Sequence, residues 1–265
     1  MPTKKRLQGN KPVVLSIAGY DPSSGAGTTA DIKTIAAHGC YGVTCITALT
    51  VQSTRGVRRM ETVEGRVITE TLEELMSDMD IASVKIGMLA SAEAARAVTG
   101  FLKRYQPRYV VLDPVLRSSS GAQLLSTEGV QILKDHLLAL ALVVTPNIDE
   151  AAALTGLPVT NLDEMASAAA RLRHSGAANV VITGGHLDPP ADLIDAKSNK
   201  APVVLSGKKI VTRSTHGTGC AFSTSLACNL VLGLDVVEAT KAAKRFVESA
   251  LKNPPGVGRG SGPIV

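Results

Sequence analysis

Short runs of β-branched and other apolar residues alternate along the chain with longer segments whose apolar positions recur every three to four residues. The short runs predict buried strands, and the longer periodic segments predict helices with one buried face. Strands are expected at residues 13–17, 43–49, 83–86, 109–112, 142–145 and 180–183. Helices are expected near residues 28–38, 66–79, 92–103 and 127–138. This alternation indicates an α/β fold with a mostly parallel central sheet and helices on both faces.

The alternation stops at residues 187–213, where prolines surround short apolar pieces at 193–194, 203–205 and 210–212. Prolines and short polar-flanked runs are typical of antiparallel edge strands, so an antiparallel edge is expected near residues 190–213. No internal repeat and no low-complexity linker divides the chain. We therefore expect one domain over residues 13–265, preceded by a flexible N-terminal extension of residues 1–12.

A glycine turn stands near the end of the chain, where residues 214–220 read Ser-Thr-His-Gly-Thr-Gly-Cys and lead into an apolar run at 221–234. Glycines at 217 and 219 allow a turn that points backbone N–H groups at one place, and the following helix adds its positive N-terminal dipole. The pattern predicts an anion site, with Cys220 as a candidate proton acceptor because a helix N-terminus can lower the pKa of a thiol. A helix that merely starts with glycines and a small buried cysteine is the alternative.

Polar and glycine residues also follow the predicted strands, at the edge of an α/β sheet where ligands collect. They are the loop 19–27 with Asp21, Gln52, Gly87 and Met88, Asp113, Asn147 with Glu150, and residues 184–186. Each has a structural alternative: Asp113 before a proline can be a turn residue, and Asn147 can cap a helix with Glu150 completing a capping box. Glu150 can equally hold a metal near phosphates. The coincidence of so many such residues on one edge favours a binding site.

The standard nucleotide motifs are absent from the sequence. No stretch matches G-x-x-x-x-G-K-[ST], and the loop with Gly25 and Gly27 lacks the third glycine of G-x-G-x-x-G. The glycine-rich residues 256–262 follow a helix pattern and two prolines, so they are expected to form a C-terminal strap. A nucleotide, if bound, is held without these motifs.

Composition narrows the class of partner. The chain has 265 residues, a net charge of +5, 3% aromatic residues and no Trp, which excludes the stacking platforms of single-strand nucleic-acid binders and suits anionic small molecules. No apolar span is long enough to cross a bilayer, and no secretion signal is recognisable. The cysteines at 40, 45, 220 and 228 show no pairing motif. We expect a reduced, cytoplasmic protein with no nucleic-acid or membrane partner.

Several segments in one order carry a resemblance to a known family: residues 18–27 with 30–34, 46–52, 85–89, 111–114, 145–147 with 150–152, 184–186 and 215–220. They resemble the hydroxymethylpyrimidine and phosphomethylpyrimidine kinases of thiamine biosynthesis, in the ribokinase-like superfamily. The resemblance implies a ribokinase-like three-layer sandwich. It also implies ATP-dependent phosphorylation of 4-amino-5-hydroxymethyl-2-methylpyrimidine to the monophosphate and then to the diphosphate.

The resemblance further implies a role for individual residues. The substrate pocket is expected to contain Gly19, Asp31, Gln52 and Met88, with Asp31 and Gln52 bonding the aminopyrimidine. ATP and its phosphates are expected at Asp113, Asn147, Glu150, Gly185 and Thr215, with Asp113 and Glu150 as ligands of Mg²⁺. The expected catalytic group is Gly217, Thr218 and Gly219 as the anion hole, with Cys220 where sugar kinases of the superfamily carry an aspartate base. A monovalent cation and a homodimer are further expectations from this resemblance.

Two residues depart from the family pattern: Thr183 stands where many relatives have lysine, and Arg259 where His is frequent. Pyridoxal kinases share the fold and are the nearest alternative, although Gln52, Met88 and Cys220 together favour the pyrimidine. A binding module that has lost phosphoryl transfer is the alternative from another class. The intact glycine turn and Glu150 argue against it.

Overall fold

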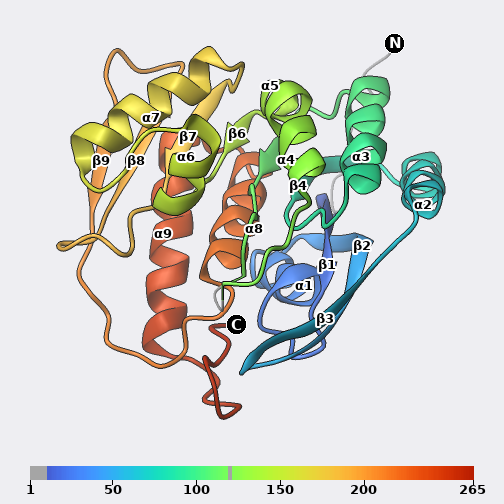
Figure 1. Cartoon of the computed structure of the whole chain (residues 1–265), viewed down its shortest axis with the longest axis horizontal. Helices are drawn as coiled ribbons and strands as arrows, with labels where there is room; N and C mark the ends of the chain where they lie inside the picture. The colour runs from blue at the N-terminus through green and yellow to red at the C-terminus, as the bar shows by residue number, and fades with distance from the viewer. Residues whose placement is uncertain (1–10, 119–120) are drawn as a thin grey trace.

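The computed structural model describes residues 11–118 and 121–265, so residues 1–10 of the predicted N-terminal extension lie outside the described residues. In the described part, the chain forms a nine-stranded sheet with the order β3-β2-β1-β4-β5-β6-β7-β8-β9 (Figure 1). The strands are β1 (Val13–Tyr20), β2 (Tyr41–Ser53), β3 (Gly56–Thr62), β4 (Ile81–Ile86), β5 (Val110–Leu112), β6 (Val143–Val144), β7 (Asn179–Ile182), β8 (Ala191–Ala196) and β9 (Val203–Ser206). All six strands expected from the main alternation are present.

The sheet is parallel in its centre and antiparallel at both edges. Pairing is parallel from β2 through β1, β4, β5 and β6 to β7. Strands β8 and β9 pair antiparallel beyond β7, which confirms the predicted edge. The expected third piece at residues 210–212 is wrong: the backbone is irregular there and Val211 is 95% exposed, so no neighbour covers its apolar side. Strand β3, antiparallel to β2, was not predicted because its residues are mostly polar and exposed.

Helices follow the strands as expected, except that one expected helix contains a π-helical segment and one helix was not expected. The helices are α1 (Gly27–Ala37), α2 (Gly65–Asp78), α3 (Ala92–Tyr105), α4 (Thr127–Ile132), α5 (Leu138–Leu140), α6 (Ile148–Thr155), α7 (Leu162–His174), α8 (Thr218–Val231) and α9 (Val236–Lys252). The helix expected at residues 127–138 contains a π-helical segment, Leu133–Leu137, between α4 and α5. The sequence analysis missed α7, although Asn161 caps its N-terminus by accepting from the Glu164 amide.

Alternate residues of each central strand face opposite cores. Val110 and Leu112 of β5 join the core under α3 and α7, whereas Val111 joins a second core with Phe222 and Leu226 of α8. Because successive strand side chains point to opposite faces, continuous apolar runs require helices on both sides. Figure 1 shows α8 and α9 side by side on one face of the sheet. This arrangement is the predicted three-layer sandwich.

The parallel pairing decides where the candidate residues lie. The carboxyl ends of β1, β4, β5 and β6 meet at one edge of the sheet, and the loops that follow them carry most of the polar residues named above. Within residues 11–118 and 121–265, no helix is both long and apolar enough to span a membrane.

Candidate active site

The glycine turn opens α8 as predicted. Gly217 is the N-cap residue with φ +83°, and a Cβ there would lie 1.8 Å from the carbonyl oxygen of Gly25. Only glycine can therefore bring this turn against the loop after β1. Because glycine has no side chain to cap the helix, the amide groups of the first turn stay available to an anion. The geometry supports the predicted anion site formed by Gly217, Thr218 and Gly219.

Two hydroxyl side chains fasten α8 to the end of β5 and to helix α1. Ser223 donates to Asp113 Oδ2 at 2.9 Å, and Thr224 donates to Asp31 Oδ1 at 2.7 Å. Both hydroxyl-bearing residues are fully buried. A Cβ on Gly219 would lie 3.9 Å from Asp113 Oδ2, so the structure brings the glycine turn and the candidate phosphate residue Asp113 together.

Cys220 lies in the first turn of α8 and is partly exposed. Burial of the sulfur raises the pKa of the thiol to about 12, the Lys85 charge works against this increase, and the charges of Asp31 and Asp113 add to it. The sequence analysis expected the helix N-terminus to lower the pKa of this thiol, and that expectation is wrong. The desolvation of the sulfur and the two carboxylates outweigh the helix dipole. In the free protein the thiol is neutral at pH 7.

Asp31 is not open to a ligand in this structure, in contrast to its expected place against the aminopyrimidine. Its side chain has no exposed surface, and both oxygens are occupied. Oδ1 accepts from Thr224 at 2.7 Å, Oδ2 accepts from Ser16 at 2.5 Å, and Lys85 Nζ lies 3.1 and 2.9 Å from the two oxygens. Asp31 therefore supports the floor of the site through an ion pair.

Lys85 is the functional candidate that sequence reasoning missed. It belongs to β4, is completely buried and pairs with Asp31. Burial lowers the pKa of Lys85, but the nearby carboxylates of Asp31 and Asp113 raise it above its usual range, so the lysine stays charged. A lysine inside a strand covered on both faces needs a buried counter-charge, and that requirement was the available signal.

The other three expected substrate residues take part in two contacts, one between Gly19 and Met88 and one between Gln52 and His216. A Cβ on Gly19 would lie 2.3 Å from Met88 Cε, so the glycine leaves room for the methionine side chain. Met88 is buried with Ala48 and Leu124. Gln52, near the end of β2, contacts His216 of the glycine turn, with 3.1 Å between their Nε2 atoms. The Gln52 amide thus lies against the glycine turn, and Met88 lies against Gly19, in the loop on which that turn packs.

Asp113 and Glu150 form an acidic pair at the ends of β5 and β6. Burial and the charge of Asp113 raise the pKa of Glu150 to about 8. Asn147 and Glu150 make the capping box that the sequence allowed, with the Glu150 amide donating to Asn147 Oδ1 at 2.8 Å and the Asn147 amide donating to Glu150 Oε2 at 3.0 Å. The described residues contain no cluster of three or more His, Cys, Asp and Glu side chains suited to a metal. Two buried carboxylates nevertheless fit Mg²⁺, which binds one or two protein carboxylates together with phosphate oxygens.

Two predicted phosphate residues lie apart from the Asp113–Glu150 pair. Gly185 is exposed after β7, with nothing within 4 Å of a Cβ placed on it. Thr215 Oγ1 lies 2.9 Å from Ser261 Oγ, in the C-terminal strap. Pro263 of the same strap pairs with His216 through a β-bridge. The strap therefore holds the start of the glycine turn in place.

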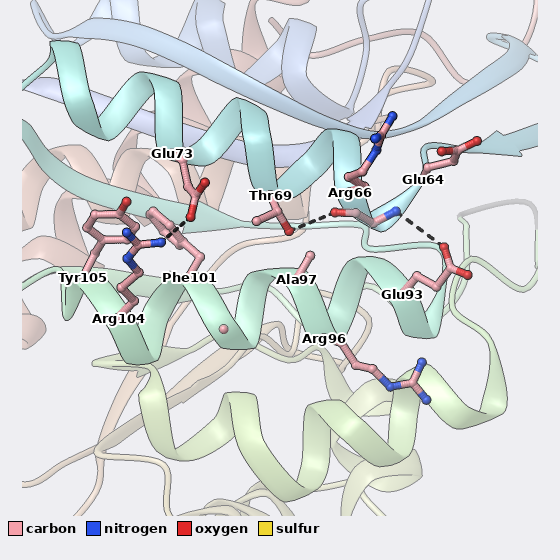
Figure 2. A pocket seen from close by; sticks show the side chains of 12 residues that line it. Glu64, Arg66, Thr69, Glu73, Glu93, Arg96, Ala97, Phe101, Arg104 and Tyr105 are labelled. Carbon is pink, nitrogen blue, oxygen red and sulfur yellow. Dashed lines mark hydrogen bonds and ion pairs between the residues drawn. The ribbon is translucent and has the colours of Figure 1, made fainter.

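A pocket of about 840 Å³ lies away from the predicted site, between α2 and α3 (Figure 2). Three of its charged side chains are engaged with neighbours: Arg104 pairs with Glu73, and Glu93 accepts from the Gly65 amide (Figure 2). None of the predicted site residues lines it. Most of the predicted site residues lie at or after the ends of the strands instead.

The sheet order, the uncapped glycine turn and the acidic pair define a ribokinase-like kinase of small molecules. The chain belongs to the phosphomethylpyrimidine kinase family, whose model matches residues 21–265. The hydroxymethylpyrimidine/phosphomethylpyrimidine kinase of Aquifex aeolicus is 40% identical over 248 residues, which cover 94% of this chain and 97% of that protein. A thiamine biosynthesis bifunctional protein of Geobacter sulfurreducens is also 40% identical, over 95% of this chain, and this chain spans 51% of its length.

Solved structures confirm the fold. The pyridoxal kinase of Staphylococcus aureus, in complex with AMP-PCP and pyridoxal, superposes with a TM-score of 0.85 at 30% identity. The superposition covers 96% of this chain and 92% of that one. The ribokinase-like architecture and the family expected from the sequence are both confirmed.

Proposed function

We propose that this protein transfers the γ-phosphoryl group of ATP to 4-amino-5-hydroxymethyl-2-methylpyrimidine, and then a second phosphoryl group to the monophosphate. The observation that carries the proposal is the approach of the uncapped N-terminus of α8 to Asp113, which is paired with Glu150, and to Gln52 through His216. Relatives named for these two reactions support it, because one of them matches 94% of this chain at 40% identity.

In the proposed reaction, the substrate oxygen bonds to the γ-phosphorus, the bond from that phosphorus to the bridging oxygen of ADP breaks, and ADP leaves. The amides of Gly217, Thr218 and Gly219 face the charge on the transferring group, which is the main catalytic contribution expected in phosphoryl transfer. Cys220 accepts the hydroxyl proton of the first substrate. Because its thiol is neutral at pH 7, Cys220 must first release its own proton to water, and the charge of Lys85 favours the thiolate.

Asp113 and Glu150 are the residues we propose to hold Mg²⁺ with the phosphates of ATP. The metal neutralises phosphate charge when it is bound. The pKa of Glu150 is raised first by burial and then by the charge of Asp113, and a divalent cation relieves the repulsion between the two carboxylates. Ser223 keeps Asp113 in place through its hydrogen bond.

Pyridoxal is the second candidate substrate, supported by the superposition on a pyridoxal kinase. The pyrimidine is favoured because Gln52 offers both a donor and an acceptor, which an aminopyrimidine edge can pair with at two points.

We further propose that the protein is cytoplasmic and a homodimer. Leu49 and Val51, which are 50% and 46% exposed on β2, are the apolar surface that a second copy would cover.

An ADP-release assay with and without the pyrimidine alcohol tests the proposed function. We expect ATP turnover that depends on the pyrimidine and on Mg²⁺. Tight binding of the pyrimidine without any ATP turnover would support the alternative, a binding module that has lost phosphoryl transfer.

A further inference from the structure

His216 connects the candidate substrate amide to the loop after β1. Its ring Nε2 lies 2.8 Å from Asp21 Oδ2 and 3.1 Å from Gln52 Nε2. The residue is 9% exposed, and its backbone amide donates to the carbonyl oxygen of Gly262 at 3.0 Å. His216 is therefore held from both its backbone and its ring, between strand β2 and the turn that opens α8.

The partners of the ring decide which atom carries a proton. Asp21 accepts from the Ser23 amide and hydroxyl and from the Ala26 amide, at 2.7 to 2.9 Å. Although burial acts to raise it, hydrogen bonds from His216 and Ser23 hold the pKa of Asp21 below its usual range. An ionised carboxylate only accepts, so Nε2 of His216 must be the protonated nitrogen.

The same reasoning sets the orientation of the Gln52 amide. With Nε2 of Gln52 toward the ring, two N–H donors face each other. Thr50 Oγ1 lies 3.2 Å from Gln52 Oε1 and 2.9 Å from the Tyr20 carbonyl oxygen, and its single proton goes to the nearer of these two acceptors. An amide turned by 180° removes both conflicts: Oε1 shares the single Nε2–H of His216 with Asp21 Oδ2 in a three-centre hydrogen bond, and Nε2 donates to Thr50.

We propose that His216 is a positioning residue that fixes the Gln52 amide in this orientation and thereby sets which edge of the substrate ring is accepted. One N–H and one lone pair of the amide then remain for the ligand, in a fixed order. A ring nitrogen beside an amino group presents the matching acceptor and donor, as adenine does to an amide. The substrate ring cannot turn over to compensate, because its hydroxymethyl group must face the glycine turn.

A double-mutant cycle between His216 and Gln52 tests this inference, which rests on the proposed contact between Gln52 and the pyrimidine. The variants are His216→Ala, Gln52→Ala and the double variant, each assayed for KM and kcat with the pyrimidine alcohol and for KM with ATP. We expect each single variant to raise the pyrimidine KM about tenfold, and the double variant to resemble Gln52→Ala. His216→Gln keeps an N–H donor and should restore most of the pyrimidine KM.

The possible outcomes separate this inference from the proposed function. If Gln52→Ala raises the pyrimidine KM but His216→Ala multiplies that effect in the double variant, His216 acts independently and the inference fails alone. If His216→Ala raises the KM for ATP as much as that for the pyrimidine, its role is structural and the inference also fails. If Gln52→Ala changes neither KM, both the inference and the proposed pyrimidine pocket are wrong.

Discussion

At the scale of single residues, the Asp31–Lys85 pair is the strongest constraint beneath the site, because both side chains are completely buried. Removing one partner leaves an uncompensated buried charge. We expect Asp31→Asn to lower the free energy of unfolding by about 3–5 kcal/mol, measured by urea denaturation. The double variant Asp31→Leu/Lys85→Met removes both charges and should recover much of that loss. Equal losses in the single and double variants would contradict this account of the pair.

Glu150 should make the stability of the protein depend on pH in the absence of ATP and Mg²⁺. Its pKa is about 8 in the folded chain against an ordinary value of 4.5, so between these values the folded state binds a proton that the unfolded state has lost. Stability therefore falls as the pH rises from about 5 to 8. We expect Glu150→Gln to flatten this dependence, measured as Tm against pH. Glu74→Gln, on the exposed surface of α2, is the matched control and should leave the slope unchanged.

The proposed role of Cys220 predicts a particular rate profile. With a pKa of about 12, the thiolate fraction rises about tenfold per pH unit across the neutral range, and the rate of the first phosphorylation should rise with it while chemistry limits turnover. Cys220→Ala should lower kcat by about a hundredfold or more and remove this dependence. A variant with the native kcat and pH profile would exclude Cys220 as the base and leave the rest of the site intact.

Residue roles were only partly predictable from the sequence. Gln52 and Met88 were predicted from their places at strand ends, and the structure places Gln52 against His216 of the glycine turn and Met88 against Gly19. Asp31 was assigned to the substrate, but its neighbours Lys85, Ser16 and Thr224 come from three different elements. No local pattern could show that these distant residues would occupy both carboxylate oxygens.

At the scale of elements, the turn before α8 offers a matched pair of glycine variants. Gly217→Ala combines φ +83° with a Cβ 1.8 Å from a backbone oxygen, so we expect it to lower Tm by several degrees and to abolish turnover. Gly219→Ala meets only Asp113 Oδ2 at 3.9 Å, so it should fold normally. It should still weaken ATP binding, measured by titration, because the added methyl occupies the proposed phosphate position. Normal Tm and activity in Gly217→Ala would show that the turn is not needed.

The elements best predicted were those with a regular pattern of apolar residues. The central strands are apolar on both faces, and α2 and α3 have one apolar face, so the period of the pattern was decisive. Strand β3 is exposed and α7 follows a helix directly, so neither produced an alternation of strand and helix. The π-helical segment 133–137 keeps an apolar face and does not alter the sequence pattern.

At the scale of the whole molecule, the sheet topology brings loops that are far apart in the sequence together at one site. Residues from 19 to 220 in the sequence meet because parallel strands end at one edge of the sheet and α8 returns across it. The alternation of strand and helix predicts parallel strands but not their order, in which β1 lies between β2 and β4. The contacts of His216 with Asp21 and Gln52 form because the turn before α8 returns to this edge of the sheet, so local sequence could not predict them.

The most direct test of the central claim is a mass-resolved assay with ATP, Mg²⁺ and either 4-amino-5-hydroxymethyl-2-methylpyrimidine or pyridoxal. We predict the pyrimidine monophosphate first and the diphosphate later, at rates well above the phosphorylation of pyridoxal. A preference for pyridoxal, or a product series that stops at the pyrimidine monophosphate, would contradict the proposed function.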